Sequence, residues 1–177
     1  MELLDNAIES IQVGVEDYQS GTRSRLLSAV RNIHAGILLL YKEALRRMSP
    51  AESNDALMMA RIVPSKDPNG KVVFIGEGKK TADTQQIKDR FDTLGIKTDW
   101  KRFDRINETR NEVEHLYPRL DQKGLEGLIP IPFCSSATSS LRNSTTSHSN
   151  SSARKLGKRC LKLLRFTRRR KRKAANS

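Results

Sequence analysis

The chain has 177 residues and a formal net charge of +13, a length that suits one domain and is too short for two of ordinary size. The charge is unevenly distributed: residues 1–126 contain 20 basic and 20 acidic residues, whereas residues 127–177 contain 13 basic residues and no acid. The first 126 residues are therefore neutral overall, which argues against a long phosphate-binding track on them.

Other features of the whole chain are those of a soluble intracellular protein. The two cysteines, Cys134 and Cys160, have no metal-binding spacing, so we interpret them as reduced thiols. The N-terminal residues 1–11 are acidic and amphipathic, unlike a signal peptide. The longest apolar run, residues 35–41, is shorter than the roughly 20 residues that a bilayer requires. We expect a cytoplasmic location and no membrane span.

Two helices are predicted first. Apolar residues recur at helical spacing over residues 3–15, and this helix is expected to end near residues 20–21. Thr22 or Ser24 can cap a second helix, which stops at residues 49–50. The second helix is the longest and most apolar segment, so we expect it to be the centre of the core.

A short β-hairpin is predicted near residues 61–75. Two β-rich runs, residues 61–63 and 71–75, flank the sequence DPNG, in which Asn69 and Gly70 are expected to form the turn. A third helix is predicted from Thr81 or Asp83 to Gly95. The predicted fold is thus mainly all-α, an up-and-down helical bundle in residues 1–130 with a β-hairpin insertion.

The last predicted helix covers residues 99–117 and ends before Pro118. Its apolar residues fall on one side of the helix: Trp100, Phe103, Ile106, Val113 and Tyr117. Arg110 lies in the middle of this stripe, where a cation is normally excluded. A charged residue expected on the buried side is either part of a structural ion pair or part of a site.

Arg110, Asn111 and His115 are the candidate catalytic residues. RNA can be cut without a metal when its 2′-hydroxyl is deprotonated and attacks the adjacent phosphate. A histidine titrates near neutral pH and can act as base or acid, and an arginine can stabilise the charge that grows on the phosphate oxygens. Asn111 lies four residues before His115, so its amide could orient the imidazole. No cofactor and no metal are expected.

The alternative to a catalytic site is an ordinary helix surface. Arg110 could pair with Glu114 one turn later, or with an acid from another helix, while His115 would be a surface residue near a helix end. His34, on the second helix, is interpreted as a satisfied core histidine and is not included among the candidates.

The sequence RNEVEH, which contains Arg110, Asn111 and His115, resembles the Arg-(polar)-x-x-x-His signature of the HEPN superfamily. The segments SAVRNIHAGILLLYKEALRRMSP and GKKTADTQQIKDRF, and the ending HLYP of the last helix, also resemble a bacterial HEPN-like family. The resemblance covers roughly residues 1–130. It implies a helical bundle that dimerises and places the motif in a cleft between subunits.

The resemblance implies two functions from different classes. Many members of the superfamily are metal-independent ribonucleases that act as toxins or defence nucleases, and this implies RNA as substrate, a homodimer, and an antitoxin protein as a further partner. Other members have lost activity and serve as scaffolds or as interaction or nucleotide- or RNA-binding modules.

Residues 131–177 are predicted to be a disordered basic tail. Residues 135–152 contain nine serines and three threonines and no acid, a composition that cannot bury enough apolar surface to fold. The basic end that follows could bind nucleic acid or an anionic membrane, or it could simply be solvated. A third explanation is that the chain is read out of frame after about Ile129, which would make the tail accidental.

Overall fold

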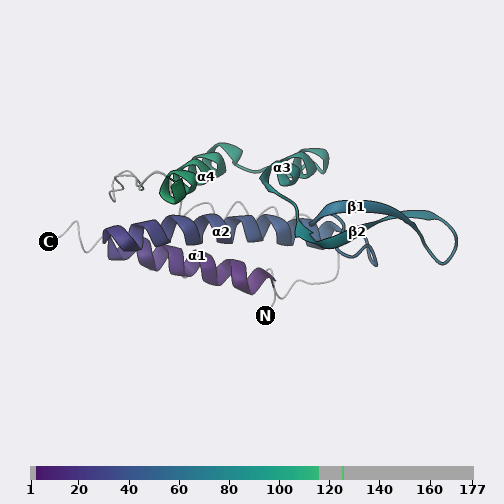
Figure 1. Ribbon diagram of the computed structural model, residues 1–177, viewed down its shortest axis with the longest axis horizontal. Coiled ribbons are helices and arrows are strands. Elements are labelled where there is room, and N and C mark those ends of the chain that lie inside the picture. The colour runs from purple at the N-terminus through teal and green to yellow at the C-terminus, as the bar shows by residue number, and fades with distance from the viewer. Residues whose placement is uncertain (1–2, 116–124, 126–177) are drawn as a thin grey trace. The chain divides into compact units, whose positions relative to one another are not determined.

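The computed structural model describes residues 3–115 and residue 125 (Figure 1). This part of the chain is mainly helical with one two-stranded antiparallel sheet, as predicted. The elements in chain order are α1 (Leu3–Ser20), α2 (Arg23–Met48), β1 (Met59–Lys66), β2 (Val72–Thr81), α3 (Thr84–Thr93) and α4 (Trp100–His115). The predicted end of the last helix at Tyr117 and the predicted basic tail lie outside the described residues.

The described residues form two compact units. One contains residues 3–7 and 35–97, and the other contains residues 8–34, 98–115 and 125. Helices α1 and α2 each contribute to both units. We call the first unit, which contains β1 and β2, the hairpin unit. The second, which contains Arg110, is called the motif unit.

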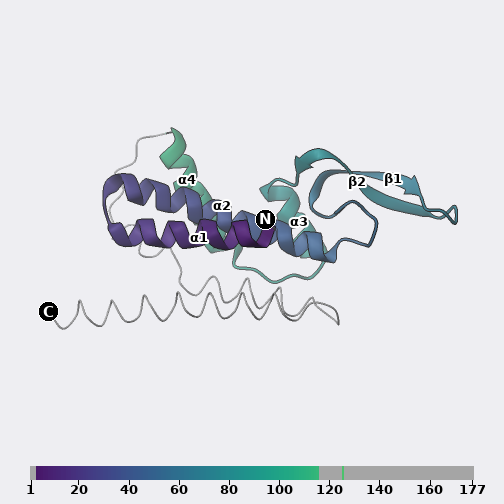
Figure 2. The same cartoon turned by 90° about the horizontal axis from the view of Figure 1, so that it is seen from below.

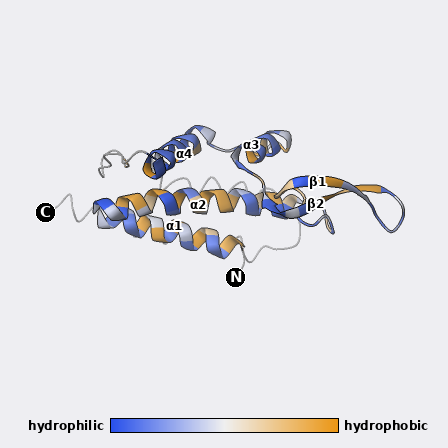
Figure 3. Ribbon diagram, viewed as in Figure 1, coloured by the Kyte–Doolittle hydropathy of each residue, from blue (hydrophilic) through white to orange (hydrophobic). Residues whose placement is uncertain are grey.

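In the motif unit, residues 8–20 of α1 and residues 23–34 of α2 run side by side in opposite directions (Figures 1 and 2). Polar and apolar residues alternate along both helices (Figure 3), as expected of amphipathic helices that bury one face. A buried cluster of four apolar residues is packed against Tyr18 and Leu27. The cluster consists of Leu26, Val30, Val113 and Leu125.

Gly14 allows α1 and α2 to approach closely in this unit. A Cβ atom at position 14 would lie 2.6 Å from Cγ1 of Ile33, 3.0 Å from the Ile33 nitrogen and 3.1 Å from the Ala29 oxygen. Two of these three neighbours are backbone atoms, which cannot move aside as a flexible side chain can. The glycine is therefore explained by packing and not by an unusual backbone conformation.

We expect Gly14→Ala to destabilise the protein by about 1–2 kcal/mol. Overpacking typically costs 1–3 kcal/mol, and the upper part of that range, about 2–3 kcal/mol, applies because two of the neighbours are backbone atoms. The better helix propensity of alanine offsets about 1 kcal/mol of that cost. Urea unfolding followed by circular dichroism would measure the change. Val13→Ala, at an exposed position of the same helix, is the control and should change stability by less than about 0.5 kcal/mol. An unchanged or increased stability of Gly14→Ala would contradict the close approach.

In the hairpin unit, β1 and β2 are longer than the predicted hairpin. The register pairs Lys66 with Val72 and continues to Met59 with Thr81. The extension arises because the segment before β1 also bonds to β2: the Gly76 nitrogen donates to the Ser53 oxygen at 2.8 Å, and Asn54 Nδ2 donates to the Gly76 oxygen at 2.7 Å. Such contacts between a loop and a strand are not visible in the local sequence pattern.

The turn also differs in type from the expected Asn69–Gly70 turn. The Gly70 nitrogen donates to the Asp67 oxygen at 2.9 Å, and the Asp67 side chain accepts from the nitrogens of Asn69 and Lys71. Gly70 has a positive φ of 79°. Pro68 suits the second position of a type I turn, so the turn spans Asp67 to Gly70 with the glycine in its left-handed last position.

Helix α3 begins at an N-cap formed by Asp83, one of the two predicted starts. The Asp83 side chain accepts from the Gln86 nitrogen at 2.9 Å, and the Gln86 side chain accepts from the Asp83 nitrogen at 3.2 Å, which completes a capping box. Phe91 of α3 packs edge-on against Tyr41 of α2, with ring centroids 5.2 Å apart. This contact joins α3 to the apolar side of α2 in the hairpin unit.

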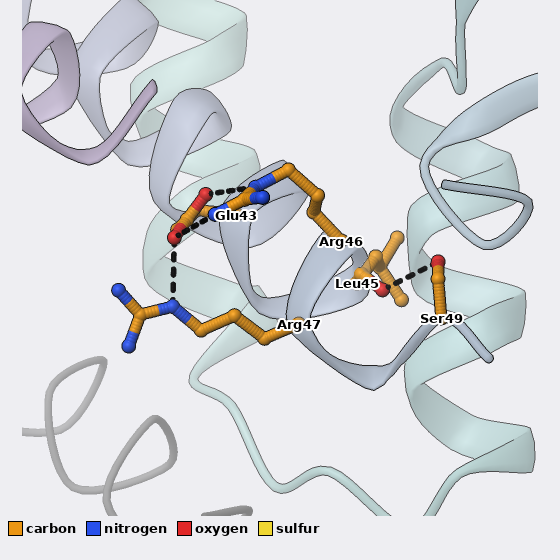
Figure 4. A network of polar contacts seen from close by, with 5 residues as sticks. All are labelled: Glu43, Leu45, Arg46, Arg47 and Ser49. Atoms are coloured by element: carbon orange, nitrogen blue, oxygen red, sulfur yellow. Dashed lines mark hydrogen bonds and ion pairs between the residues drawn. The ribbon is translucent and has the colours of Figure 1, made fainter. Parts of the chain in front are cut away.

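Glu43 is a buried acid on α2 (Figure 4). Its side chain is 1% exposed, and its two carboxylate oxygens accept hydrogen bonds from Arg46 and Arg47 at 2.7–3.1 Å. Two arginines one turn further along the same helix therefore bond to this one carboxylate.

No helix in residues 3–115 combines the length and the apolar character that a bilayer crossing requires.

Candidate functional site

Helix α4 carries the predicted motif and buries one side in the motif unit. Phe103, Ile106 and Val113 are buried, as the apolar stripe predicts, and Trp100 is partly buried. Arg110 lies between Ile106 and Val113 in the sequence of this stripe, yet its side chain is 38% exposed. Arg110 is therefore half-buried and not enclosed, because its long aliphatic stem can follow the helix surface and keep the guanidinium in water.

Arg110 contacts two neighbours on its own helix. Its Nη1 donates a hydrogen bond to Oδ1 of Asn111 at 3.1 Å, and its Nε lies 4.0 Å from Oε1 of Glu114. The second distance is at the outer limit for an ion pair. The structure thus brings Arg110 and Asn111 together, and the Asn111 amide, which was expected to orient His115, accepts a hydrogen bond from the arginine instead.

Glu114 makes its shorter contact with α2. Nε of Arg31 donates to Oε1 of Glu114 at 2.8 Å, and the two side chains are 50% and 32% exposed. The hydrogen bond from Arg31 lowers the pKa of Glu114, and the positive charges of Arg110 and His115 act in the same direction. Glu114 is therefore an anion held mainly by Arg31, with two further cationic groups close to it.

His115 is the last residue of α4 and is exposed. It is close enough to Glu114 for its charge to lower the pKa of that carboxyl. Arg110, Asn111 and His115 thus lie within the last two turns of one helix, with Glu114 near both Arg110 and His115. The exposure of His115 leaves its imidazole accessible to a ligand from solvent.

His34 of α2 is a neighbour that was expected to be a satisfied core histidine. Its ring stacks on Phe103 with centroids 5.5 Å apart, and its Nε2 is buried with no hydrogen-bond partner among the described residues. Burial lowers the pKa of His34, the positive charge of Arg110 lowers it further, and a hydrogen bond with Asn107 partly opposes both. The imidazole is therefore held in its neutral form.

We expect the free energy of unfolding to fall as the pH drops below about 6.5, the pKa of an unfolded histidine. The unfolded chain binds the His34 proton more tightly than the folded chain does, so this contribution is lost as pH falls toward the lowered folded pKa. His34→Phe, which cannot be protonated, should remove this component of the pH dependence. Urea midpoints between pH 5 and 8 would test it, with His115→Phe as a control that retains the component.

Sequence reasoning did not identify Arg31 as a partner of the motif. Arg31 lies 83 residues before Glu114, and no local spacing relates them. The sequence did show that Arg110 and Glu114 are four residues apart, and this spacing was the basis for the alternative in which Arg110 forms a structural ion pair. Within residues 3–115 and residue 125, no group of three or more His, Cys, Asp or Glu residues is placed to hold a metal ion.

The charged and polar side chains around Arg110 form a group that we call the motif cluster. It consists of Arg31 and His34 on α2 and of Asn107, Arg110, Asn111, Glu114 and His115 on α4. It combines cationic groups, a single carboxylate and a solvent-accessible imidazole, a set suited to a phosphate-containing ligand.

Comparisons of the chain with protein-family models, with curated proteins and with solved structures gave no match.

Proposed function

We propose that the protein is a metal-independent ribonuclease of the HEPN type, with a toxin-like or defence-like role. In this proposal Arg110 and His115 are the catalytic residues, and Asn111 supports them by holding the Arg110 guanidinium through Oδ1. RNA is the substrate, two copies of the chain form the active unit, and an antitoxin protein is a further partner.

The observation that carries the proposal is the loose pairing of Arg110. Its Nε is 4.0 Å from Glu114, whereas the Arg31 Nε is 2.8 Å from the same oxygen. The nearby acid is thus occupied mainly by Arg31, and the half-exposed Arg110 guanidinium keeps donors available for a phosphate. An arginine needed only to neutralise Glu114 would not require a second, closer arginine.

The reaction needs a proton acceptor, a proton donor and a cation. A neutral imidazole takes the proton from the 2′-hydroxyl, whose oxygen attacks the adjacent phosphorus and forms a 2′,3′-cyclic phosphate. The bond to the 5′-oxygen breaks, and an imidazolium gives a proton to that oxygen, so the products are a cyclic phosphate and a 5′-hydroxyl. Arg110 stabilises the negative charge on the non-bridging oxygens during the attack.

Helix geometry favours two copies at the active centre. Residues five apart are separated by about 140° around a helix, so Arg110 and His115 of one chain point in different directions. Two copies related by a twofold axis can direct Arg110 of one and His115 of the other toward the same phosphate. Once this imidazole has accepted the 2′-hydroxyl proton, it is the imidazolium that gives a proton to the 5′-oxygen, so one composite site contains every group that the reaction requires.

Cleavage of end-labelled RNA by the purified protein in excess chelator tests the proposal. We expect cleavage that is insensitive to chelator, products with cyclic phosphate ends, and none with an oligonucleotide whose 2′-hydroxyls are replaced by hydrogen. The last result follows because the attacking group is then absent. Cleavage of the deoxy oligonucleotide, or activity that chelator abolishes, would contradict the proposed chemistry.

A second candidate is a catalytically inactive HEPN-like interaction or nucleotide/RNA-binding module. The ion pair between Arg31 and Glu114 favours it, because it gives the charged residues of α2 and α4 a structural role. This candidate predicts that the folded protein cuts no RNA, and that Glu114→Gln lowers stability. It would become the preferred function if the chelator experiment showed a folded protein and intact RNA.

A further inference from the structure

The β-hairpin exposes large apolar side chains on a sheet that has only two strands. Val72 is 57% exposed and Phe74 is 62% exposed, and both belong to β2. In the register, Phe74 is opposite Pro64 and Val72 is opposite Lys66, so these residues share one face. An isolated two-stranded hairpin is at best marginally stable in water, and a hairpin gains stability from a helix packed against it or from further strands. Here α3 bonds to the base of β1, through Gln86 and Arg90. A third strand would therefore stabilise the hairpin.

The hydrogen-bond pattern determines which backbone groups of β2 face away from β1. The Gly76 nitrogen bonds to Ser53 outside the hairpin, so Gly76 is a non-hydrogen-bonded partner of β1. The pattern alternates along an antiparallel pair, so the N–H and C=O groups of Val72 and Phe74 also face outward. Pro64, opposite Phe74, has no N–H to give, which agrees with this alternation.

The two edges of the hairpin are not equivalent. The outward edge of β1 contains Pro64, which cannot donate a hydrogen bond, and the Ala60 oxygen accepts from Gln86 Nε2 at 3.1 Å. On β2, Ser53 and Asn54 already occupy the outward groups of Gly76. A proline and covered backbone groups are the usual means of blocking an edge strand. The outward groups of Val72 and Phe74 form the part of β2 that is open to a new strand.

We propose that β2 of one copy pairs with β2 of a second copy, so that two hairpins form one four-stranded antiparallel sheet. Identical edges can pair only about a twofold axis, and the axis passes through Val73. Val72 of each copy then lies opposite Phe74 of the other, and each such pair exchanges both of its hydrogen bonds.

In the neighbouring registers, an open residue of β2 would lie opposite a residue that is already hydrogen-bonded or that belongs to the turn. With the axis at Phe74, Val72 would lie opposite Gly76 of the second copy, whose backbone groups are already bonded to Ser53 and Asn54. With the axis at Val72, Phe74 would lie opposite Gly70 in the turn. The axis at Val73 also places Lys71 diagonally across from Glu77 of the second copy, where it would add a second cation to the ion pair that Glu77 forms with Arg61 of its own hairpin.

The proposed sheet can be tested by disulfide formation. In a background with Cys134→Ser and Cys160→Ser, Val73→Cys places two cysteines opposite one another with Cα atoms about 4.5 Å apart, within the range for a disulfide. Oxidation should therefore give a covalent dimer. Ser65→Cys, on β1 opposite Val73, is the matched control, because its two copies would be about 14 Å apart across the sheet.

A second control tests the register. The two copies of Ile75→Cys would be about 14 Å apart along the strands, so this variant should not form the dimer. No more covalent dimer from Val73→Cys than from Ser65→Cys would overturn the proposal. Equal cross-linking of Val73→Cys and Ile75→Cys would overturn the proposed register.

Proline at position 72 tests the backbone hydrogen bonds. Val72→Pro removes an N–H that faces the second copy and leaves the bonds between β1 and β2 intact. We expect it to weaken self-association at least tenfold in sedimentation equilibrium, with an unchanged circular dichroism spectrum, whereas Val72→Ala retains the N–H and associates more strongly than the proline variant. A monomeric parent, or a dimer that persists in Val72→Pro, would overturn the proposal. The measurement does not depend on RNA cleavage, and a dimer that persists in Val72→Pro would overturn this proposal while leaving the two-copy active unit of the proposed function intact.

Discussion

Arg110→Ala and His115→Ala are each expected to lower the rate of RNA cleavage by about 10²–10³-fold while the protein remains folded. Loss of one group that stabilises transition-state charge typically costs this much, and loss of a general acid or base costs a similar factor. The half-exposure of Arg110 and the exposure of His115 mean that neither truncation leaves a large cavity. Single-turnover cleavage of labelled RNA measures the rates.

The controls separate catalysis from charge and from folding. Arg105→Ala removes an exposed arginine from the same helix and should retain activity close to that of the parent. Arg110→Lys keeps the charge but loses the planar arrangement of donors, so most of the activity should be lost. If Arg105→Ala and Arg110→Ala lose activity equally, the effect is one of general charge and the catalytic assignment is wrong.

The double variant tests whether the two residues act together. Groups that act in one step are strongly non-additive, so Arg110→Ala combined with His115→Ala should be only slightly slower than either single variant. Fully multiplicative losses would indicate that the two side chains contribute to separate steps. Active heterodimers formed by mixing the two single variants would support a site shared between copies, because one composite site would then retain both residues.

Much of the fold was predictable from local signals. Helical spacing of apolar residues identified α1, α2 and α4, and the alternatives for the start of α3 included its cap, Asp83. The DPNG segment located the turn. The extension of β1 and β2 was not predictable, because it depends on hydrogen bonds between Gly76 and the loop residues Ser53 and Asn54, and this loop has no regular pattern.

The candidate site was predictable only in part. The motif residues are adjacent in sequence, so their proximity follows from the helix itself. The contributions of Arg31 and His34 depend on how α2 and α4 pack in the motif unit, which spacing within one helix cannot reveal. The position of Arg110 in the apolar stripe suggested burial, but a side chain with a long flexible stem need not follow the direction of its Cβ.

Glu43→Ala is expected to destabilise the protein by about 3 kcal/mol. Removing one partner of a buried ion pair typically costs 3–5 kcal/mol, because the remaining charge is left uncompensated. The side chains of Arg46 and Arg47 are 39% and 16% exposed, so water partly compensates them and the lower end of the range applies. Urea unfolding measures the effect, and Glu112→Ala, at an exposed position of α4, is the control.

The pH dependence distinguishes an ion pair from simple packing at Glu43. Burial raises the pKa of Glu43, but hydrogen bonds from Arg46 and Arg47 lower it by more, so the net shift is downward. The folded chain then holds this proton less tightly than the unfolded chain, and the stabilisation is complete above the unfolded pKa of about 4.3. It is lost as pH falls through the lowered folded pKa. The difference in unfolding free energy between the parent and Glu43→Gln should therefore shrink in acid, whereas a difference due to packing alone would not change with pH.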